Sequence, residues 1–175
     1  MLGLYDNFPE SIHRITGFTF SIPLRRLQEK FIQALYEVNN KAVSPEEISP
    51  HALRECDIFF ETGVAESRSF TYLDQELATK LQEAVKREPL KTVDFFFAAR
   101  YYKTSKEKKI PLRFDYFLVR AVFFDGNLEV RIFHERGPRY ISPEDVSNFV
   151  VQRINRIASR KILRMIGQNP LSAGS

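Results

Sequence analysis

The sequence contains one cysteine, no tryptophan and only seven glycines. A single cysteine excludes an internal disulfide and is typical of a reducing compartment, so we expect a cytoplasmic location. The glycines are scattered, which excludes a glycine-rich phosphate loop and a dinucleotide-binding fingerprint. The Gly-x-Ser-x-Gly motif of many serine hydrolases is also absent. The common sequence signatures of nucleotide-dependent enzymes and of these hydrolases are therefore missing.

Long apolar runs and clusters of metal ligands are missing as well. No stretch approaches the roughly 20 apolar residues of a membrane-spanning helix, so we expect no membrane partner. The first residues lack the pattern of a signal peptide, a basic segment followed by an apolar run. His13, His51 and His134 are far apart in the sequence, and no pair has metal-ligand spacing. We therefore expect no metal and no cofactor, and we assign no catalytic residue.

The composition is that of a globular protein with an uneven charge. The chain has 175 residues, of which 43% are hydrophobic and 27% charged. This length favours a single domain over residues 1–175, with two lobes that meet near residue 89 as the alternative. Residues 1–90 hold ten Lys or Arg and fourteen acids, a net charge of −4, whereas residues 91–175 hold sixteen and eight, a net of +8. A basic half indicates an anionic partner or a solvated surface.

Apolar periodicity predicts five strands and three main helices. The strands are expected at about 14–22, 57–64, 91–103, 111–124 and 128–135. The helices are expected at about 24–39, 71–88 and 143–166, with capping residues at Ser21, Thr71 and Ser142, and a short helix begins at Ser44-Pro45. Residues 167–175 are expected to form a frayed tail.

The sequence Asp125-Gly126-Asn127 predicts a tight hairpin between the last two strands. A two-residue loop places alternate residues of the two strands on one apolar face: Phe117, Val119, Ala121, Phe123, Leu128, Val130, Ile132 and His134. The expected fold class is α+β: an antiparallel meander sheet of about four to five strands packs against helices, with a long C-terminal helix.

Two groups of basic residues suggest contact with nucleic acid. The last predicted helix carries a basic stripe formed by Arg153, Arg156, Arg160 and Arg164. A basic loop follows Tyr101-Tyr102 and contains Lys103, Lys106, Lys108 and Lys109. An amphipathic basic helix and a lysine loop next to aromatic residues are both able to bind a phosphate backbone. The alternative is that both are solvated surface, paired with the acids of the N-terminal half.

Two further places are candidate anion sites. Arg25 and Arg26 lie in the first turn of a predicted helix, where no acid offsets the helix dipole, so an anion would be stabilised there. The alternative is that Arg25 pairs with Glu29, one turn further along the helix.

The second place is the sequence IFHERGPRYISPEDV, residues 132–146, which offers Arg136 and Arg139 ahead of the last helix. Glu144 and Asp145 already occupy the first turn of that helix. This stretch therefore favours a structural joint, in which the two arginines pair with those acids.

Three classes of function are consistent with these observations. The first is a non-enzymatic protein that binds RNA or DNA through its basic C-terminal half. The second is an assembly protein that forms homo-oligomers, or binds an acidic protein partner, through complementary charged halves, with Tyr116, Leu118 and Phe133 at the interface. The third is an anionic-ligand pocket or an enzyme built around Arg25, Arg26, His134 and Arg136, which requires these residues to converge.

Overall fold

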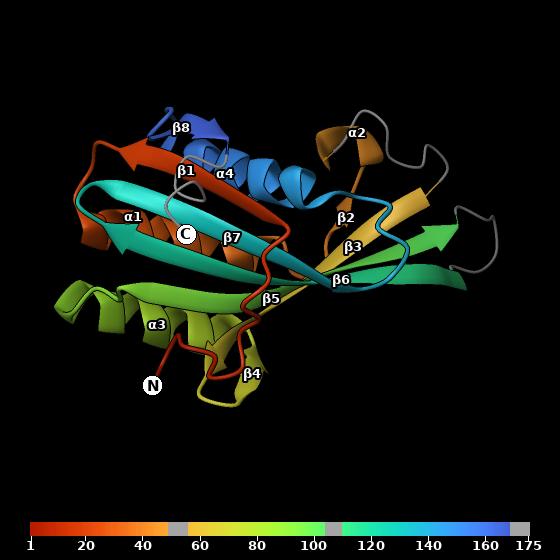
Figure 1. Ribbon diagram of the computed structural model, residues 1–175, viewed down its shortest axis with the longest axis horizontal. Coiled ribbons are helices and arrows are strands. Elements are labelled where there is room, and N and C mark those ends of the chain that lie inside the picture. Colours follow the sequence, from red (N-terminus) through yellow and green to blue (C-terminus); the bar gives the residue numbers. More distant parts are fainter. Residues whose placement is uncertain (49–55, 104–109, 169–175) are drawn as a thin grey trace.

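The computed structural model describes residues 1–48, 56–103 and 110–168. These residues form an α+β fold in which eight strands make one sheet, and every pairing between them is antiparallel (Figure 1). The strands are β1 (Arg14–Phe20), β2 (Ala42–Val43), β3 (Cys56–Glu66), β4 (Ser69–Tyr72), β5 (Thr92–Lys103), β6 (Ile110–Phe124), β7 (Asn127–Arg136) and β8 (Leu163–Gln168). The helices are α1 (Leu24–Glu37), α2 (Pro45–Ile48), α3 (Gln75–Arg87) and α4 (Pro143–Ala158).

The sheet is larger than the predicted meander of four to five strands, and that part of the fold prediction is wrong. The strand order is β2-β3-β5-β6-β7-β1-β8, and β4 also pairs with β3. Strands β5, β6 and β7 follow each other as a meander, as predicted for the three strands after residue 90. The N-terminal strand β1 pairs with β7, and β8 pairs with β1, so the two ends of the described chain extend the same edge of the sheet.

The prediction of a long C-terminal helix over 143–166 is also wrong. Helix α4 ends at Ala158, and Ser159 adopts a left-handed conformation with φ of 58°. The Asn155 side chain then accepts hydrogen bonds from the backbone N–H groups of Ile162 and Leu163, both at 2.9 Å. These two buried apolar residues direct the chain onto β1, where it forms β8. The predicted frayed tail fails at Gly167 and Gln168, which lie in β8, and residues 169–175 lie outside the described residues.

The predicted helix starts have mixed outcomes. Ser142 caps α4 and forms a capping box with Asp145, as its position predicts. Thr71 does not cap α3, because it belongs to β4, and the helix is capped by the Asp74 side chain instead. Ser21 does not cap α1; Pro23 occupies the N-cap position, and no side chain bonds the free N–H groups of the first turn.

The face shared by β6 and β7 is confirmed by their register. Phe117 pairs with His134, Val119 with Ile132, Ala121 with Val130 and Phe123 with Leu128. Helices α1, α3 and α4 cover this face, behind the sheet in the view of Figure 1. Aromatic rings fill the space between the layers; Phe149 of α4, for example, lies 5.0 Å from Phe60, centroid to centroid. No helix in the described residues is long and apolar enough to cross a membrane.

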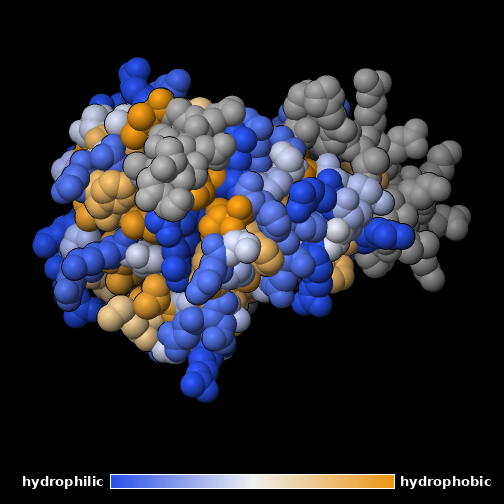
Figure 2. Space-filling view, in the orientation of Figure 1, coloured by the Kyte–Doolittle hydropathy of each residue, from blue (hydrophilic) through white to orange (hydrophobic). Residues whose placement is uncertain are grey.

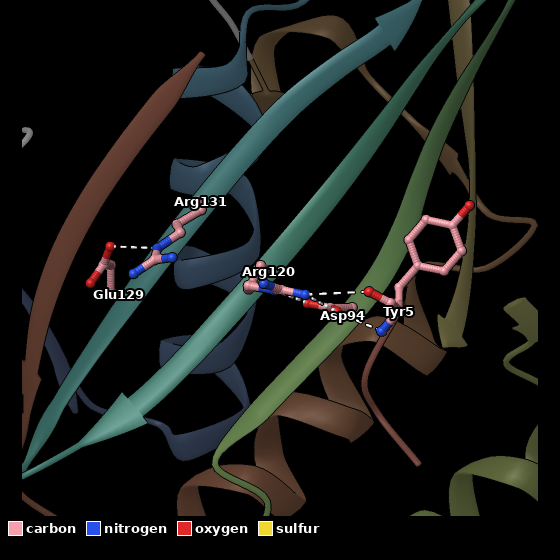
Figure 3. A network of polar contacts seen from close by, with 5 residues as sticks. All are labelled: Tyr5, Asp94, Arg120, Glu129 and Arg131. Carbon is pink, nitrogen blue, oxygen red and sulfur yellow. Dashed lines mark hydrogen bonds and ion pairs between the residues drawn. The ribbon is translucent and has the colours of Figure 1, made fainter. Parts of the chain in front are cut away.

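We call the opposite face of the sheet the outer face. The N-terminal segment, residues 1–13, crosses it, in front of the sheet in Figure 1. The segment is held by a buried ion pair, in which Asp94 receives hydrogen bonds from the Arg120 guanidinium at 2.7 and 2.8 Å and from the Tyr5 N–H at 2.7 Å (Figure 3). On the visible part of this face, hydrophobic groups are separated by hydrophilic ones (Figure 2).

Candidate nucleic-acid interface

The stretch from Ile132 to Val146 is organised by a buried carboxylate that sequence reasoning did not identify. Asp115 of β6 is fully buried, and its two oxygens accept four hydrogen bonds. The donors are the His134 Nε2 at 2.8 Å, the Arg139 N–H at 2.6 Å, the Tyr101 hydroxyl at 2.6 Å and the Tyr140 N–H at 2.8 Å. A carboxylate has about four acceptor positions, so all of them are filled. The alternation of strand residues was a usable signal, since it places Asp115 on the same face as Phe117.

This cluster supports the interpretation of the stretch as a structural joint. Burial raises the pKa of the Tyr101 hydroxyl, and its hydrogen bond to Asp115 raises it further, so the hydroxyl remains a donor at physiological pH. The predicted pairing of Arg136 and Arg139 with the acids of the next helix is not what the structure shows. Glu144 pairs with Arg14 at 3.3 Å, and Asp145 is engaged in the capping box.

His13 binds the same joint from the N-terminal segment. Its Nδ1 accepts a hydrogen bond from the His134 backbone N–H at 2.8 Å, and its ring stacks on Phe133 with centroids 4.8 Å apart. Because Nδ1 must be unprotonated to accept this bond, protonation of the ring breaks the contact. Desolvation, followed by the charges of Arg139 and His134, lowers the pKa of His13.

We therefore expect the His13 imidazole to titrate below pH 6.5 in the folded protein. A group with a depressed pKa binds fewer protons in the folded state than in the unfolded state. The contribution of His13 to stability is thus present above pH 6.5 and is lost as the pH falls through the folded pKa. An NMR titration of the ring protons, assigned with His13→Gln, measures this value, and a midpoint at or above 6.5 contradicts the proposed contact.

The residues of the hypothetical ligand pocket do not converge. Arg25 lies just after β1, at the end of the sheet where Thr19 pairs with Asn127. His134 lies near the opposite end of β7, seven positions from Asn127, which is roughly 23 Å of strand. Arg136 and Arg139 lie at the His134 end. Within the described residues, no group of histidine, cysteine and acidic side chains could hold a metal ion.

The basic stripe predicted on one helix is divided between three elements. Arg153 and Arg156 lie on α4, Arg160 lies in the turn after it, and Arg164 lies in β8. Arg153 is less available to a ligand than the other three arginines, because it pairs with Glu47 at 3.7 Å and lies over the Phe149 ring. Arg156, Arg160 and Arg164 are exposed.

The fold brings this C-terminal group close to the start of α1. Phe20, at the end of β1, pairs with Leu163 at the start of β8, and α1 begins four residues after Phe20. Figure 1 shows the start of α1, the end of α4 and β8 at one end of the molecule, on the left. We call this surface the basic end, and it is formed by Arg25, Arg26, Arg156, Arg160, Lys161 and Arg164. Sequence reasoning had treated its two halves as separate sites.

The cations of the basic end are not engaged in ion pairs with the acids of the described residues. All six side chains are exposed, and none forms an ion pair with an acid of the described residues. The predicted alternative for Arg25 does not occur, because Glu29 pairs with Lys86 of α3 at 3.4 Å. After Asp145 the sequence contains five basic residues and no acid.

Of the four lysines of the predicted basic loop, the described residues include Lys103, which lies at the end of β5 away from the basic end. Strand β5 begins at Thr92, next to Lys91, whose carbonyl accepts a hydrogen bond from the Phe123 N–H near the basic end. Lys103 is the last residue of this strand, eleven positions or roughly 36 Å from Thr92. Lys106, Lys108 and Lys109 lie outside the described residues. The contact of these three lysines with a phosphate backbone therefore stays a prediction.

The predicted assembly interface is partly covered by the chain itself. Leu118 is 5% exposed, and Phe133 lies under the His13 ring.

Comparisons with known proteins add no evidence on function: no protein-family model matches the chain, and no match was found among curated proteins or solved structures.

Proposed function

We propose that the protein binds nucleic acid, RNA or DNA, through the basic end. The observation that supports this best is that Arg25 and Arg26 lie at the same end of the sheet as the cations that follow α4 and those of β8. Two segments more than a hundred residues apart in the sequence contribute positive charge there that is not paired with an acid of the described residues. A phosphate backbone presents the matching row of negative charges and releases its counterions when cations replace them.

The start of α1 strengthens this proposal. Its first turn has no acidic residue and no capping side chain, so N–H groups and the positive end of the helix dipole face solvent beside two arginines. The arginines cost some helix stability there, by several tenths of a kcal/mol each, unless an anion lies close by. A bound phosphate group would offset that cost and accept hydrogen bonds from the free N–H groups.

The proposed location is the cytoplasm. The single cysteine, Cys56, is buried and forms no disulfide. A chain that uses no disulfide fits a reducing compartment, where both RNA and DNA partners are found.

Charge reversal at the basic end should weaken nucleic-acid binding by about a hundredfold or more at low salt. The variant is Arg26→Glu with Arg156→Glu and Arg160→Glu. Three lost phosphate contacts should also reduce the slope of log K against log salt by about 2 to 3. Fluorescence anisotropy with labelled single- and double-stranded RNA and DNA measures both quantities.

The control compares two double reversals of equal charge. Arg156→Glu with Arg160→Glu changes the basic end and should weaken binding, whereas Arg68→Glu with Lys80→Glu changes two exposed cations outside it and should leave affinity close to that of the unmodified protein. Equal weakening by the two double reversals would show that net charge, not this surface, determines binding. Circular dichroism and thermal melting of both variants establish that the fold is kept.

A further inference from the structure

The outer face carries a row of alternating aromatic and arginine side chains at the end of the sheet opposite the basic end. Phe59 of β3 pairs with Arg100 of β5, and Arg100 pairs with Phe114 of β6. Arg136 of β7 lies beside them, with its guanidinium carbon 5.7 Å from the centroid of the Phe114 ring. We call these four residues the aromatic–arginine row. They come from four adjacent strands.

Strand alternation directs the row away from the core. The neighbours of these residues along the strands, Phe60, Tyr101 and Asp115, are buried on the helix-covered face. Phe114 is 45% exposed, although it is a large apolar residue. An exposed phenylalanine in the middle of a sheet face leaves much of its ring available to a ligand.

A second layer of rings supports the row. Tyr116 lies under the Arg136 guanidinium at 5.4 Å and stacks on Phe96, with centroids 5.4 Å apart and an angle of 18° between the rings. Tyr102 packs edge-to-face against Phe59 at 5.2 Å. These contacts fix the orientation of the rings before any ligand binds, which lowers the entropy cost of binding.

The charge of the row favours an anionic ligand. Arg100 is paired with Glu61, so its charge is offset. Arg136 forms no ion pair with an acid of the described residues, and its nearest acid along the chain is Glu135, which is exposed. An arginine guanidinium near aromatic rings can stack on nucleobases and also contact phosphate.

We propose that the aromatic–arginine row binds unpaired nucleobases, so that the nucleic acid recognised by this protein is single-stranded in at least one segment. The row spans three strand spacings, a width of roughly 14 Å, which is enough for two or three bases that leave the nucleic-acid stack and lie against side chains. Bases paired within a duplex cannot stack on side chains in this way. This inference rests on the proposed function, because the ligand is again a nucleic acid, but it concerns a different surface.

The absence of tryptophan provides a direct test. Phe114→Trp introduces a single tryptophan, and single-stranded oligonucleotide should quench its emission, whereas a duplex of the same length should not. The control is Thr79→Trp, at an exposed position of α3 that belongs neither to the row nor to the basic end. Its emission should not change on addition of the single strand.

Affinity measurements complete the test. Phe114→Ala should weaken single-strand binding by about 5- to 100-fold and leave the affinity for duplex and the salt slope unchanged. If Phe114→Ala changes nothing and the tryptophan is not quenched, the row does not bind bases, although the charge-reversal result at the basic end still stands by itself. If no nucleic acid binds the unmodified protein, both proposals are overturned.

Discussion

Replacement of Asp115 with alanine should lower the free energy of unfolding by about 3–5 kcal/mol. The carboxylate is itself fully buried and accepts hydrogen bonds from four donors. Removing it leaves a tyrosine hydroxyl and two backbone N–H groups without their partner, and each such group costs about 1–3 kcal/mol when buried. Urea denaturation with a two-state fit measures the change.

Two controls separate the role of the cluster from a general effect of losing an acid. Asp6→Ala removes an exposed aspartate and should change stability by less than about 0.5 kcal/mol. Tyr101→Phe removes one of the four donors and should cost about 1–2 kcal/mol. If Asp115→Ala costs no more than Tyr101→Phe, the carboxylate does not hold the joint together.

Replacement of Gly137 with alanine should cost about 3 kcal/mol or more, for a reason that differs from that at Asp115. Gly137 has φ of +113°, a conformation that residues with a side chain rarely adopt. A Cβ atom there would lie 2.6 Å from the Asp115 Oδ1 and 2.8 Å from the Asp115 Cα, and it would also clash with the Phe114 carbonyl oxygen. Backbone strain and steric overlap therefore act together, and urea denaturation measures their sum.

Gly126 provides the matched control, because it isolates the conformational part of the effect. Its φ is +74°, and an added Cβ would meet no atom within 4 Å. Gly126→Ala should cost only about 1–2 kcal/mol, the ordinary penalty for a left-handed alanine. If the two substitutions lower the free energy of unfolding by similar amounts, the close approach of Gly137 to β6 does not add to the conformational penalty.

Local pattern predicted the β6–β7 hairpin correctly because short-range chemistry determines it. Asp125 and Gly126 both have positive φ, as a tight two-residue turn requires, and the pairing of Phe124 with Asn127 follows from the loop length. The register then places alternate residues in the core without any long-range information.

The formation of strand β8 after α4 could not be predicted from the helical pattern of apolar residues. Isoleucine and leucine at 162 and 163 continue the apolar spacing of α4, so periodicity alone extends the helix. In the structure, these residues gain more burial against β1 than a helix beyond the core could offer. The edge of β1 that accepts β8 lies more than 140 residues earlier in the chain, and no local signal indicates it.

The same limit applies to the candidate site. The sequence identified most cations of the basic end one by one, but only the pairing of β1 with β8 shows that Arg26 and Arg164 belong to the same end of the sheet. Conversely, the sequence could not show that Arg153 would be engaged by Glu47. Residue type is visible in a sequence, whereas convergence depends on the topology of the sheet.

The most direct test of the account is the salt dependence of nucleic-acid binding by the unmodified protein. Labelled oligonucleotides of 20 to 30 nucleotides, a length of about twice the site size of a small binding domain, are titrated at several salt concentrations. We expect binding at low salt that weakens steeply, with log K falling by about 3 to 5 per tenfold increase in salt, which corresponds to four to six phosphate contacts. Binding that does not depend on salt, or no binding at low salt, would contradict the assignment of the basic end as a nucleic-acid interface.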